Sequence, residues 1–174
     1  MFEGAVVVMG VTSCGKTTVG EALAKELHTA LFIEGDKLHP ESNIAKMSAG
    51  IALTDEDRWP WLIRVGAALA GHECRIASCS ALKRVYRERI AQAAGRPVAF
   101  VFLDGSRELL MKRIAERKGH FMPPSLLDSQ LKTLEPPQAD EWALRLDIAQ
   151  PVTELVAQAA AWLQGSAKHG RHHR

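Results

Sequence analysis

The sequence predicts a three-layer α/β/α fold, in which a parallel sheet of five strands has helices packed on both faces. Two observations support this prediction. Short apolar runs alternate with amphipathic segments along the chain, and such alternation is typical of parallel sheets covered by helices. The first apolar run also passes through a glycine-containing turn directly into a helical pattern. We therefore expect ligands at the carboxyl ends of the strands.

The first expected strand covers residues 5–9, an unbroken apolar run rich in valine. A helix is expected over 16–28, where apolar residues recur every four positions, and the last helix, over 151–164, has the clearest apolar stripe at helical spacing. The other strands are expected at 31–34, 74–79, 98–103 and 145–148, and the other helices at 60–71, 84–94 and 106–118.

Length and composition favour one domain, over residues 1–165, followed by a basic, histidine-rich tail over 166–174 that we expect to be disordered. No apolar run approaches the ~18 residues of a membrane-spanning helix, and no signal peptide is visible. Three cysteines do not make a disulfide framework, so we expect buried thiols in a reduced protein.

The formal net charge of +2 comes from the tail, because without Lys168, Arg171 and Arg174 the chain has 19 basic and 20 acidic residues. Nucleic-acid-binding domains carry a clear excess of basic residues. We therefore expect neither nucleic acid nor a membrane as a partner.

The turn after the first strand fits the phosphate-binding pattern G-x-x-x-x-G-K-[ST], and it has the strand before it and the helix after it that the pattern requires. The turn reads Gly10-Val11-Thr12-Ser13-Cys14-Gly15-Lys16-Thr17. Backbone N–H groups of this loop and of the helix start, Thr18 included, are expected to surround the phosphates of ATP. Lys16 is expected to reach the β- and γ-phosphates, and the Thr17 hydroxyl to hold Mg²⁺.

Two segments, residues 35–58 and 117–141, are too long and too polar for simple connections. In compact domains such segments are usually binding loops or lids. The second contains Gly119 and four prolines. We expect it to be a mobile lid that excludes water from a phosphoryl group in transfer.

Asp36 follows the second expected strand, at the same sheet edge as the phosphate loop. A carboxylate there can accept a hydrogen bond from a substrate hydroxyl and orient it towards the γ-phosphate, although Asp36 also suits a turn after Gly35. His39 is equally compatible with a ligand contact and with a turn, because the proline after it holds its backbone extended. Glu34 is expected to be structural or to support the site indirectly.

Arg58 follows three acidic residues, just before the helix expected to start at Pro60. Acidic residues suit the positive end of a helix and a cation does not, so Arg58 is a candidate for binding a substrate carboxylate. Lys83, Arg84 and Arg87 form a basic cluster after the third strand. We expect at least one of them to bind an anion, and a solvated helix face is the alternative.

Arg113 and Arg117 lie four residues apart on one expected helix face, shortly before Gly119. Two arginines beside a glycine hinge suit a lid that brings positive charge to the phosphates, and a pair of surface arginines is the alternative. The turn at Gln150, before the last helix, is where we expect the edge of the adenine site.

Several blocks of the sequence resemble the gluconokinase family, small kinases related to shikimate and adenylate kinases. The resemblance spans residues 5–160. Many NTPases share the phosphate loop, so two other blocks are more specific, Gly35-Asp36-Lys37-Leu38-His39-Pro40 and Ser78-Cys79-Ser80-Ala81-Leu82-Lys83. The family often has Asp where this chain has Glu34, and it often reads Ser-Gly-Ser-Gly-Lys-Ser where this chain has Thr12-Ser13-Cys14-Gly15-Lys16-Thr17. The change at Cys14 leaves the flexibility of the loop open.

The resemblance implies a P-loop kinase fold with a lid, and phosphorylation of D-gluconate at its 6-hydroxyl by ATP and Mg²⁺, commonly in a cytoplasmic homodimer. It implies that Lys16, Asp36 and Arg117 act in catalysis. The residues that it places at gluconate are Asp36, His39, Arg58, Lys83, Arg84 and His120.

Two other functions stay open on the sequence alone. One is a kinase for another acceptor, such as shikimate or a nucleoside monophosphate. The other is a nucleotide-binding module without transfer activity. Against the module, Asp36, Arg58 and Arg117 together supply an acceptor site and a lid, which a nucleotide sensor does not need.

Overall fold

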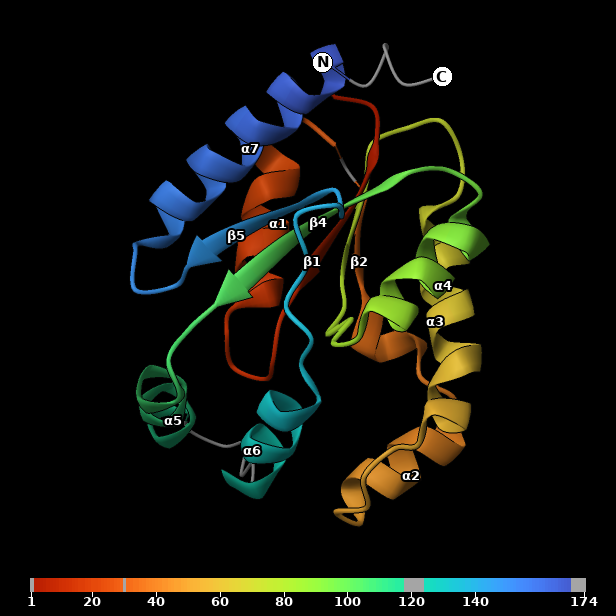
Figure 1. The fold of residues 1–174 in the computed structure, drawn as a ribbon, viewed down its shortest axis with the longest axis vertical. Coiled ribbons are helices and arrows are strands. Elements are labelled where there is room, and N and C mark those ends of the chain that lie inside the picture. Colours follow the sequence, from red (N-terminus) through yellow and green to blue (C-terminus); the bar gives the residue numbers. More distant parts are fainter. Residues whose placement is uncertain (1, 30, 118–123, 170–174) are drawn as a thin grey trace.

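The structure, a computed structural model, describes residues 2–29, 31–117 and 124–169, the last three by their backbone alone. Its strands form one parallel sheet in the order β2-β3-β1-β4-β5 (Figure 1). The strands are β1 (Ala5–Met9), β2 (Phe32–Glu34), β3 (Arg75–Ser78), β4 (Val98–Asp104) and β5 (Ala143–Asp147). The expected five-stranded parallel sheet is confirmed.

Helices cover both faces of the sheet, which confirms the three-layer arrangement (Figure 1). Helices α1 (Lys16–Glu26) and α7 (Val152–His169) pack together on one face, and α3 (Asp55–Leu69) and α4 (Arg84–Ala94) on the other. The remaining helical elements lie towards the carboxyl ends of the strands (Figure 1). They are the 3-10 helix η1 (Gly35–Leu38), α2 (Glu41–Ser48), α5 (Arg107–Glu116) and α6 (Pro124–Thr133).

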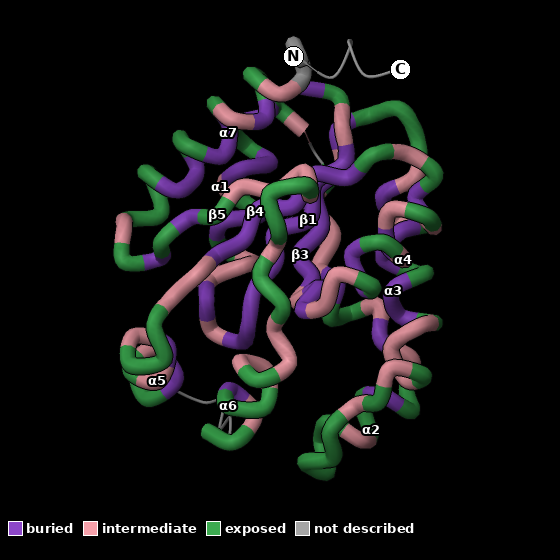
Figure 2. The backbone as a smooth tube through the Cα atoms, viewed as in Figure 1, coloured by how far each residue is buried: buried purple, intermediate pink, exposed green. Residues whose placement is uncertain are grey.

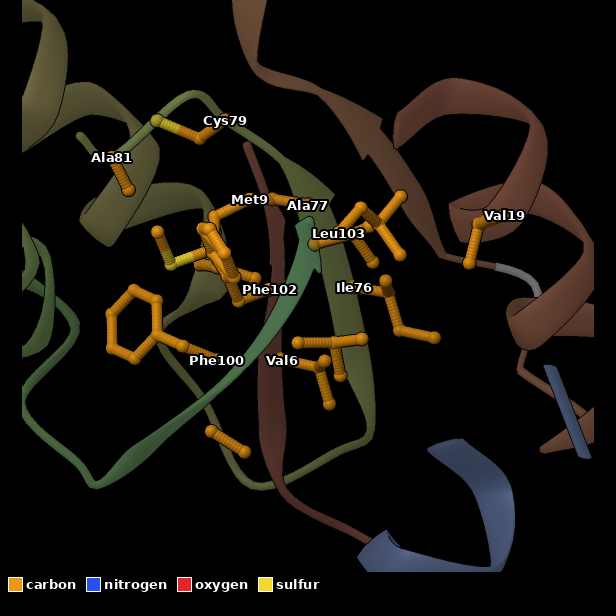
Figure 3. Packing of buried hydrophobic residues seen from close by; sticks show 14 of the residues in the cluster. Val6, Met9, Val19, Ile76, Ala77, Cys79, Ala81, Phe100, Phe102 and Leu103 are labelled. Atoms are coloured by element: carbon orange, nitrogen blue, oxygen red, sulfur yellow. The ribbon is translucent and has the colours of Figure 1, made fainter. Parts of the chain in front are cut away.

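Strand β1 is the centre of the hydrophobic core. All five of its residues are 0% exposed, as expected for a parallel strand that is covered on both faces and reads as an unbroken apolar run. Val7 pairs with Ala77 of β3 on one side and with Phe100 of β4 on the other. Buried residues are concentrated in the sheet and on the helix faces against it (Figure 2), and Met9 and Phe102 pack among them (Figure 3).

Helix α3 begins at Asp55 and not at Pro60, so the expected start of this helix was wrong. Thr54 caps it: its hydroxyl accepts a hydrogen bond from the Asp57 N–H at 3.2 Å, and the Asp57 carboxylate accepts one from the Thr54 N–H at 2.9 Å. This capping box satisfies two backbone donors at the helix start. The acidic residues therefore form the first turn of α3, and Pro60 lies inside the helix at the loss of one backbone hydrogen bond.

Both long polar segments contain helices. Residues 35–58 include η1, α2 and the first turn of α3, and residues 117–141 include α6. Helix α7 continues to His169, so the first four residues of the expected disordered tail are helical; residues 170–174 lie outside the described residues. Among the described residues no helix is long and apolar enough to cross a membrane.

A buried ion pair joins α4 to the segment before β5. Arg87 is 2% exposed, and its Nε and Nη2 donate to the two carboxylate oxygens of Glu141 at 2.7 and 3.2 Å. Its guanidinium also donates to the backbone oxygens of Ala81 and Glu135. Burial opposes ionisation of Glu141, but the Arg87 hydrogen bonds leave its pKa lowered. Arg87 therefore has a structural role.

Arg87→Met is expected to destabilise the fold by about 3–5 kcal/mol, because it leaves the Glu141 carboxylate buried without its partner. Chemical denaturation measures this loss. The matched control is Arg107→Met, which breaks the exposed pair of Arg107 with Asp128 and should cost at most about 1 kcal/mol. Equal losses in the two variants would contradict the structural role of Arg87.

Candidate active site

The phosphate loop turns tightly between the end of β1 and the start of α1. Gly10 has a φ of 147°, and a Cβ there would lie 2.8 Å from the backbone oxygen of Leu103, so only glycine fits. Gly15, the N-cap of α1, has a φ of 99°, and Ser13 has a φ of 66°. Such left-handed residues turn successive N–H groups towards one concave face, which is suited to an anion.

Two side chains of the loop carry further hydrogen-bond donors. Ser13 Oγ is buried and has no hydrogen-bond partner among the described residues, and such an unpaired group costs about 1–3 kcal/mol. Lys16 Nζ donates to the backbone oxygen of Val11 at 2.9 Å and lies 3.9 Å from Cys14 Sγ. A hydroxyl without a partner and an ammonium group in one loop fit the oxygens of a phosphate. The loop therefore has the donors that a triphosphate requires.

Thr17 and Glu34 place two oxygen-bearing side chains beside the loop. The Thr17 hydroxyl donates to Glu34 Oε1 at 3.3 Å. Glu34 ends β2, and its other carboxylate oxygen is 3.4 Å from Lys37 Nζ. Hydroxyl and carboxylate oxygens are the ligands that Mg²⁺ prefers, so these residues fit the ion. Glu34 was expected to support the site indirectly, and it contacts the residue expected to hold the metal.

Two residues from later elements contact the loop. Arg113 of α5 donates to the backbone oxygens of Cys14, at 3.3 Å, and of Ile148, at 2.9 Å, and so ties the loop to the turn after β5. Gln130 of α6 accepts a hydrogen bond from the Thr12 N–H at 2.7 Å. No sequence pattern pointed to Gln130, because a glutamine in an amphipathic helix carries no pattern of its own.

The other residues predicted for ATP, for catalysis from the lid, or for the substrate beside the lid belong to different segments. Gln150 is in the turn after β5, where its side chain donates to the Asp147 backbone oxygen at 3.2 Å. Thr18 is exposed in the first turn of α1. Arg117 is the exposed C-cap of α5. His120 lies outside the described residues.

On the acceptor side, Asp36 lies in η1, directly after β2, and is exposed. His39 follows the same turn, and its N–H donates to the Asp36 backbone oxygen. The His39 ring is buried and stacks on Trp61 at 4.0 Å between ring centroids. Burial lowers the pKa of His39, and Arg58 lowers it further, while Asp36 acts in the opposite direction. His39 is therefore held towards its neutral form.

Asn43 fixes which nitrogen of His39 carries the proton. Asn43 Nδ2 donates to the backbone oxygen of Asp57 at 2.8 Å and lies 3.2 Å from His39 Nδ1. A backbone oxygen only accepts, so the first contact sets the orientation of the amide. His39 Nδ1 then accepts from Asn43, and Nε2 carries the proton as a donor. Asn43 was missed because its two contacts join different elements.

Arg58 and Lys83 come together over the ring of Tyr86. Arg58 Cζ lies 5.3 Å and Lys83 Nζ 5.6 Å from the centroid of that ring. Both also approach the Asp55 carboxylate, at 3.9 and 3.5 Å. Two of the cations expected to bind the substrate thus lie side by side on a buried aromatic residue.

Arg84 does not join this pair. Its guanidinium donates to both carboxylate oxygens of Asp140, at 3.0 and 2.7 Å, and to Glu88 at 3.2 Å. These bonds hold the side chain on the outer part of α4. Of the three basic residues expected after the third strand, Lys83 is the one beside Arg58, since Arg87 is held by Glu141.

Comparison with known proteins places this chain in a family. The model of the AAA domain family matches residues 6–137. The thermosensitive gluconokinase of Escherichia coli K12 is 45% identical over 157 residues, covering 87% of this chain and 83% of that protein. The gluconokinase of Gluconobacter oxydans is 49% identical over 146 residues, covering 81% and 80%.

Solved structures agree with these relatives. The crystal structure of a gluconokinase from Sinorhizobium meliloti 1021 is similar with a TM-score of 0.90 at 50% identity, over 99% of each chain. The APS kinase of Mycobacterium tuberculosis, at 16% identity and a TM-score of 0.66 over 94% of this chain and 99% of that one, shares the fold alone. The chain belongs to the gluconokinase family of P-loop kinases.

Proposed function

We propose that this chain is a gluconokinase, which transfers the γ-phosphoryl group of ATP to the 6-hydroxyl of D-gluconate and yields 6-phospho-D-gluconate and ADP. The observation that carries the proposal is a phosphate loop together with a second group of cations, Arg58 and Lys83, suited to a carboxylate. Relatives that match most of the chain are gluconokinases by name.

At the ATP end, the N–H groups of residues 10–18 would bind the phosphates, with Lys16 on the β- and γ-phosphates. Arg113 and Gln150 would border the nucleoside, because Arg113 already joins the loop to the turn that carries Gln150. Arg117 would approach the transferring phosphoryl group from the lid that we propose over residues 117–141.

We propose Thr17 as the Mg²⁺ residue, with Glu34 beside it. When bound, the ion would neutralise charge on the β- and γ-phosphates. The role of these two residues is to keep oxygen donors next to the loop. Their contact supports the assignment, because a carboxylate that accepts from the Thr17 hydroxyl can also accept from a water on the metal.

At the acceptor end, Asp36 would accept a hydrogen bond from the 6-hydroxyl, orient it towards the phosphoryl group and take its proton as the bond forms. Phosphoryl transfer has a loose transition state, so orientation and charge supply most of the catalysis and a strong base is not needed. His39 would donate from Nε2 to a gluconate hydroxyl. Arg58 and Lys83 would bind the carboxylate, which leaves Arg84 with its acidic neighbours.

We also propose that residues 1–165 form a single kinase domain, and that the protein is a cytoplasmic homodimer. The support for the dimer and the compartment is the family to which the chain belongs. Sedimentation of the purified protein gives the oligomeric state directly.

A coupled assay of ADP release with gluconate, shikimate and nucleoside monophosphates as acceptors tests the function. Release that depends on gluconate alone is the expected result. A preference for another acceptor would assign a different kinase activity, and release that is independent of every acceptor would favour a nucleotide-binding module.

Lys16→Ala is expected to abolish gluconate-dependent ADP release, because it removes the charge proposed to lie on the β- and γ-phosphates. The matched control is Lys25→Ala, an exposed lysine in the last turn of the same helix, which should turn over at the wild-type rate. Near-normal activity of Lys16→Ala would remove the proposed role of the phosphate loop.

Removal of divalent cations by EDTA is expected to abolish activity, and added Mg²⁺ to restore it. Thr17→Val keeps the shape of the side chain without its hydroxyl, so the Mg²⁺ concentration for half-maximal rate should rise. Thr17→Ser keeps the hydroxyl and should behave as wild type. An unchanged Mg²⁺ requirement in Thr17→Val would show that Thr17 does not hold the ion.

Arg58→Ala is expected to reduce kcat/KM for gluconate by about 2–5 kcal/mol of transition-state stabilisation, because it removes one partner of a largely buried charge pair. The KM for ATP should change little. Arg89→Ala, which removes a cation over the ring of Trp59, is the control. If the KM for gluconate stays at the wild-type value in Arg58→Ala, Arg58 is a structural residue.

A further inference from the structure

The pair formed by Arg58 and Lys83 rests on two residues to which the proposed reaction assigns no role, Tyr86 and Asp55. Tyr86 is 1% exposed, and its ring meets that of Trp59 edge-on at 5.8 Å. Its hydroxyl accepts a hydrogen bond from Arg58 Nη1 at 3.0 Å and donates one to the Asp55 carboxylate. The hydroxyl therefore bridges a proposed substrate residue and an acid.

The direction of both hydrogen bonds is fixed by the charges. Burial and the contact with Asp55 raise the pKa of Tyr86 to about 12, so its hydroxyl keeps its proton at neutral pH. The Tyr86 hydrogen bond, with a further contribution from Lys83, lowers the pKa of Asp55, so its carboxylate is ionised. The hydroxyl proton points to Asp55, and an oxygen lone pair is left for Arg58.

This bridge uses only one corner of the Arg58 guanidinium. Among the described residues, Nη1 makes the contacts with the Tyr86 hydroxyl and with the Asp55 carboxylate, whereas Nε and Nη2 have no hydrogen-bond partner. The side chain is 19% exposed. The edge formed by Nε and Nη2 is the fork that binds a carboxylate with two parallel hydrogen bonds. The hydrogen bond from Nη1 to Tyr86 therefore sets the direction in which the open edge of the guanidinium points.

We propose that Tyr86, oriented by Asp55, is a positioning residue for the substrate carboxylate: it holds Arg58 so that the open guanidinium edge and the Lys83 ammonium meet that carboxylate together. This inference rests on the proposed gluconokinase function. A guanidinium held in place before binding loses less side-chain freedom when the substrate arrives. The hydrogen bond to Tyr86 then sets the position of Arg58 and leaves Nε and Nη2 free for the substrate carboxylate.

The same cluster suits a monocarboxylate by its charge. Arg58 and Lys83 are cationic, Asp55 is anionic and Tyr86 is neutral, which leaves one positive charge for the substrate to neutralise. A neutral acceptor of the same shape would leave oriented donors without a partner, and such sites reject the analogue that lacks the matching group. Tyr86 thus contributes to the choice of an acid over a neutral sugar derivative.

Tyr86→Phe tests the inference, because it keeps the ring under both cations and removes only the hydroxyl. The KM for gluconate is expected to rise about tenfold, the loss of one hydrogen bond to a charged group. The kcat, the KM for ATP and the melting temperature should stay close to wild type. An unchanged KM for gluconate, or equal losses in kcat and in the affinity for ATP, would overturn the inference.

Two further measurements separate positioning from general damage. Asp55→Asn keeps an oxygen that can accept from Tyr86, so its KM for gluconate should stay within about threefold of wild type; a rise as large as in Tyr86→Phe would overturn the positioning role of the hydroxyl. Competition by D-gluconamide, a neutral analogue, should be equally strong in wild type and Tyr86→Phe. A parallel loss for gluconate and gluconamide would mean that the whole site is damaged.

The outcomes also distinguish the two proposals. If the wild-type protein does not phosphorylate gluconate, the proposed function fails and the inference fails with it. If the wild type does so, and Arg58→Ala raises the KM for gluconate while Tyr86→Phe does not, the function stands and the role of Tyr86 alone is wrong.

Discussion

The complete burial of β1 is the constraint on which the rest of the structure depends. A strand with no exposed residue needs neighbours on both edges and helices on both faces. The helices lie in the connections between parallel strands, so all strands end at the same edge of the sheet. The phosphate loop follows the central strand, and the residues after β2, β3 and β4 are brought around it. A two-substrate site thus follows from the way the core is covered.

The acceptor side depends on the start of α3. The capping box of Thr54 and Asp57 begins this helix five residues before Pro60, and the first two turns then carry most of the contacts of the site. Asp55 meets Tyr86 and Lys83, the Asp57 backbone oxygen binds Asn43, and Trp61 stacks on His39. If the helix began at Pro60, Asp55 and Asp57 would make their contacts from an extended segment, whose ordering costs more conformational entropy.

The sequence was sufficient for the sheet and the phosphate loop, because periodicity and glycine spacing are local signals. It was insufficient where a role depends on contacts between distant segments. Arg87 was grouped with its basic neighbours, although a buried Glu141 makes it structural. Gln130, Asn43 and Tyr86 have no local signal at all. Pro60 misled the prediction of α3, since a proline is common at a helix start but is also tolerated later when the cap lies upstream.

Cys14 shows how a single residue changes the thermodynamics of the phosphate loop. Its φ is not among the positive values of the loop, so its backbone accepts a side chain without strain, and its sulfur is packed 2.7 Å from where a Cβ on Gly10 would lie. At such a position any side chain restricts the unfolded chain more than glycine does, which stabilises the fold by about 0.4–1 kcal/mol. The two positions are packed together: the thiol and the Leu103 backbone oxygen both occupy space that a side chain at residue 10 would need. Removal of the thiol would therefore open space beside Gly10, but the Leu103 oxygen would still exclude a side chain there.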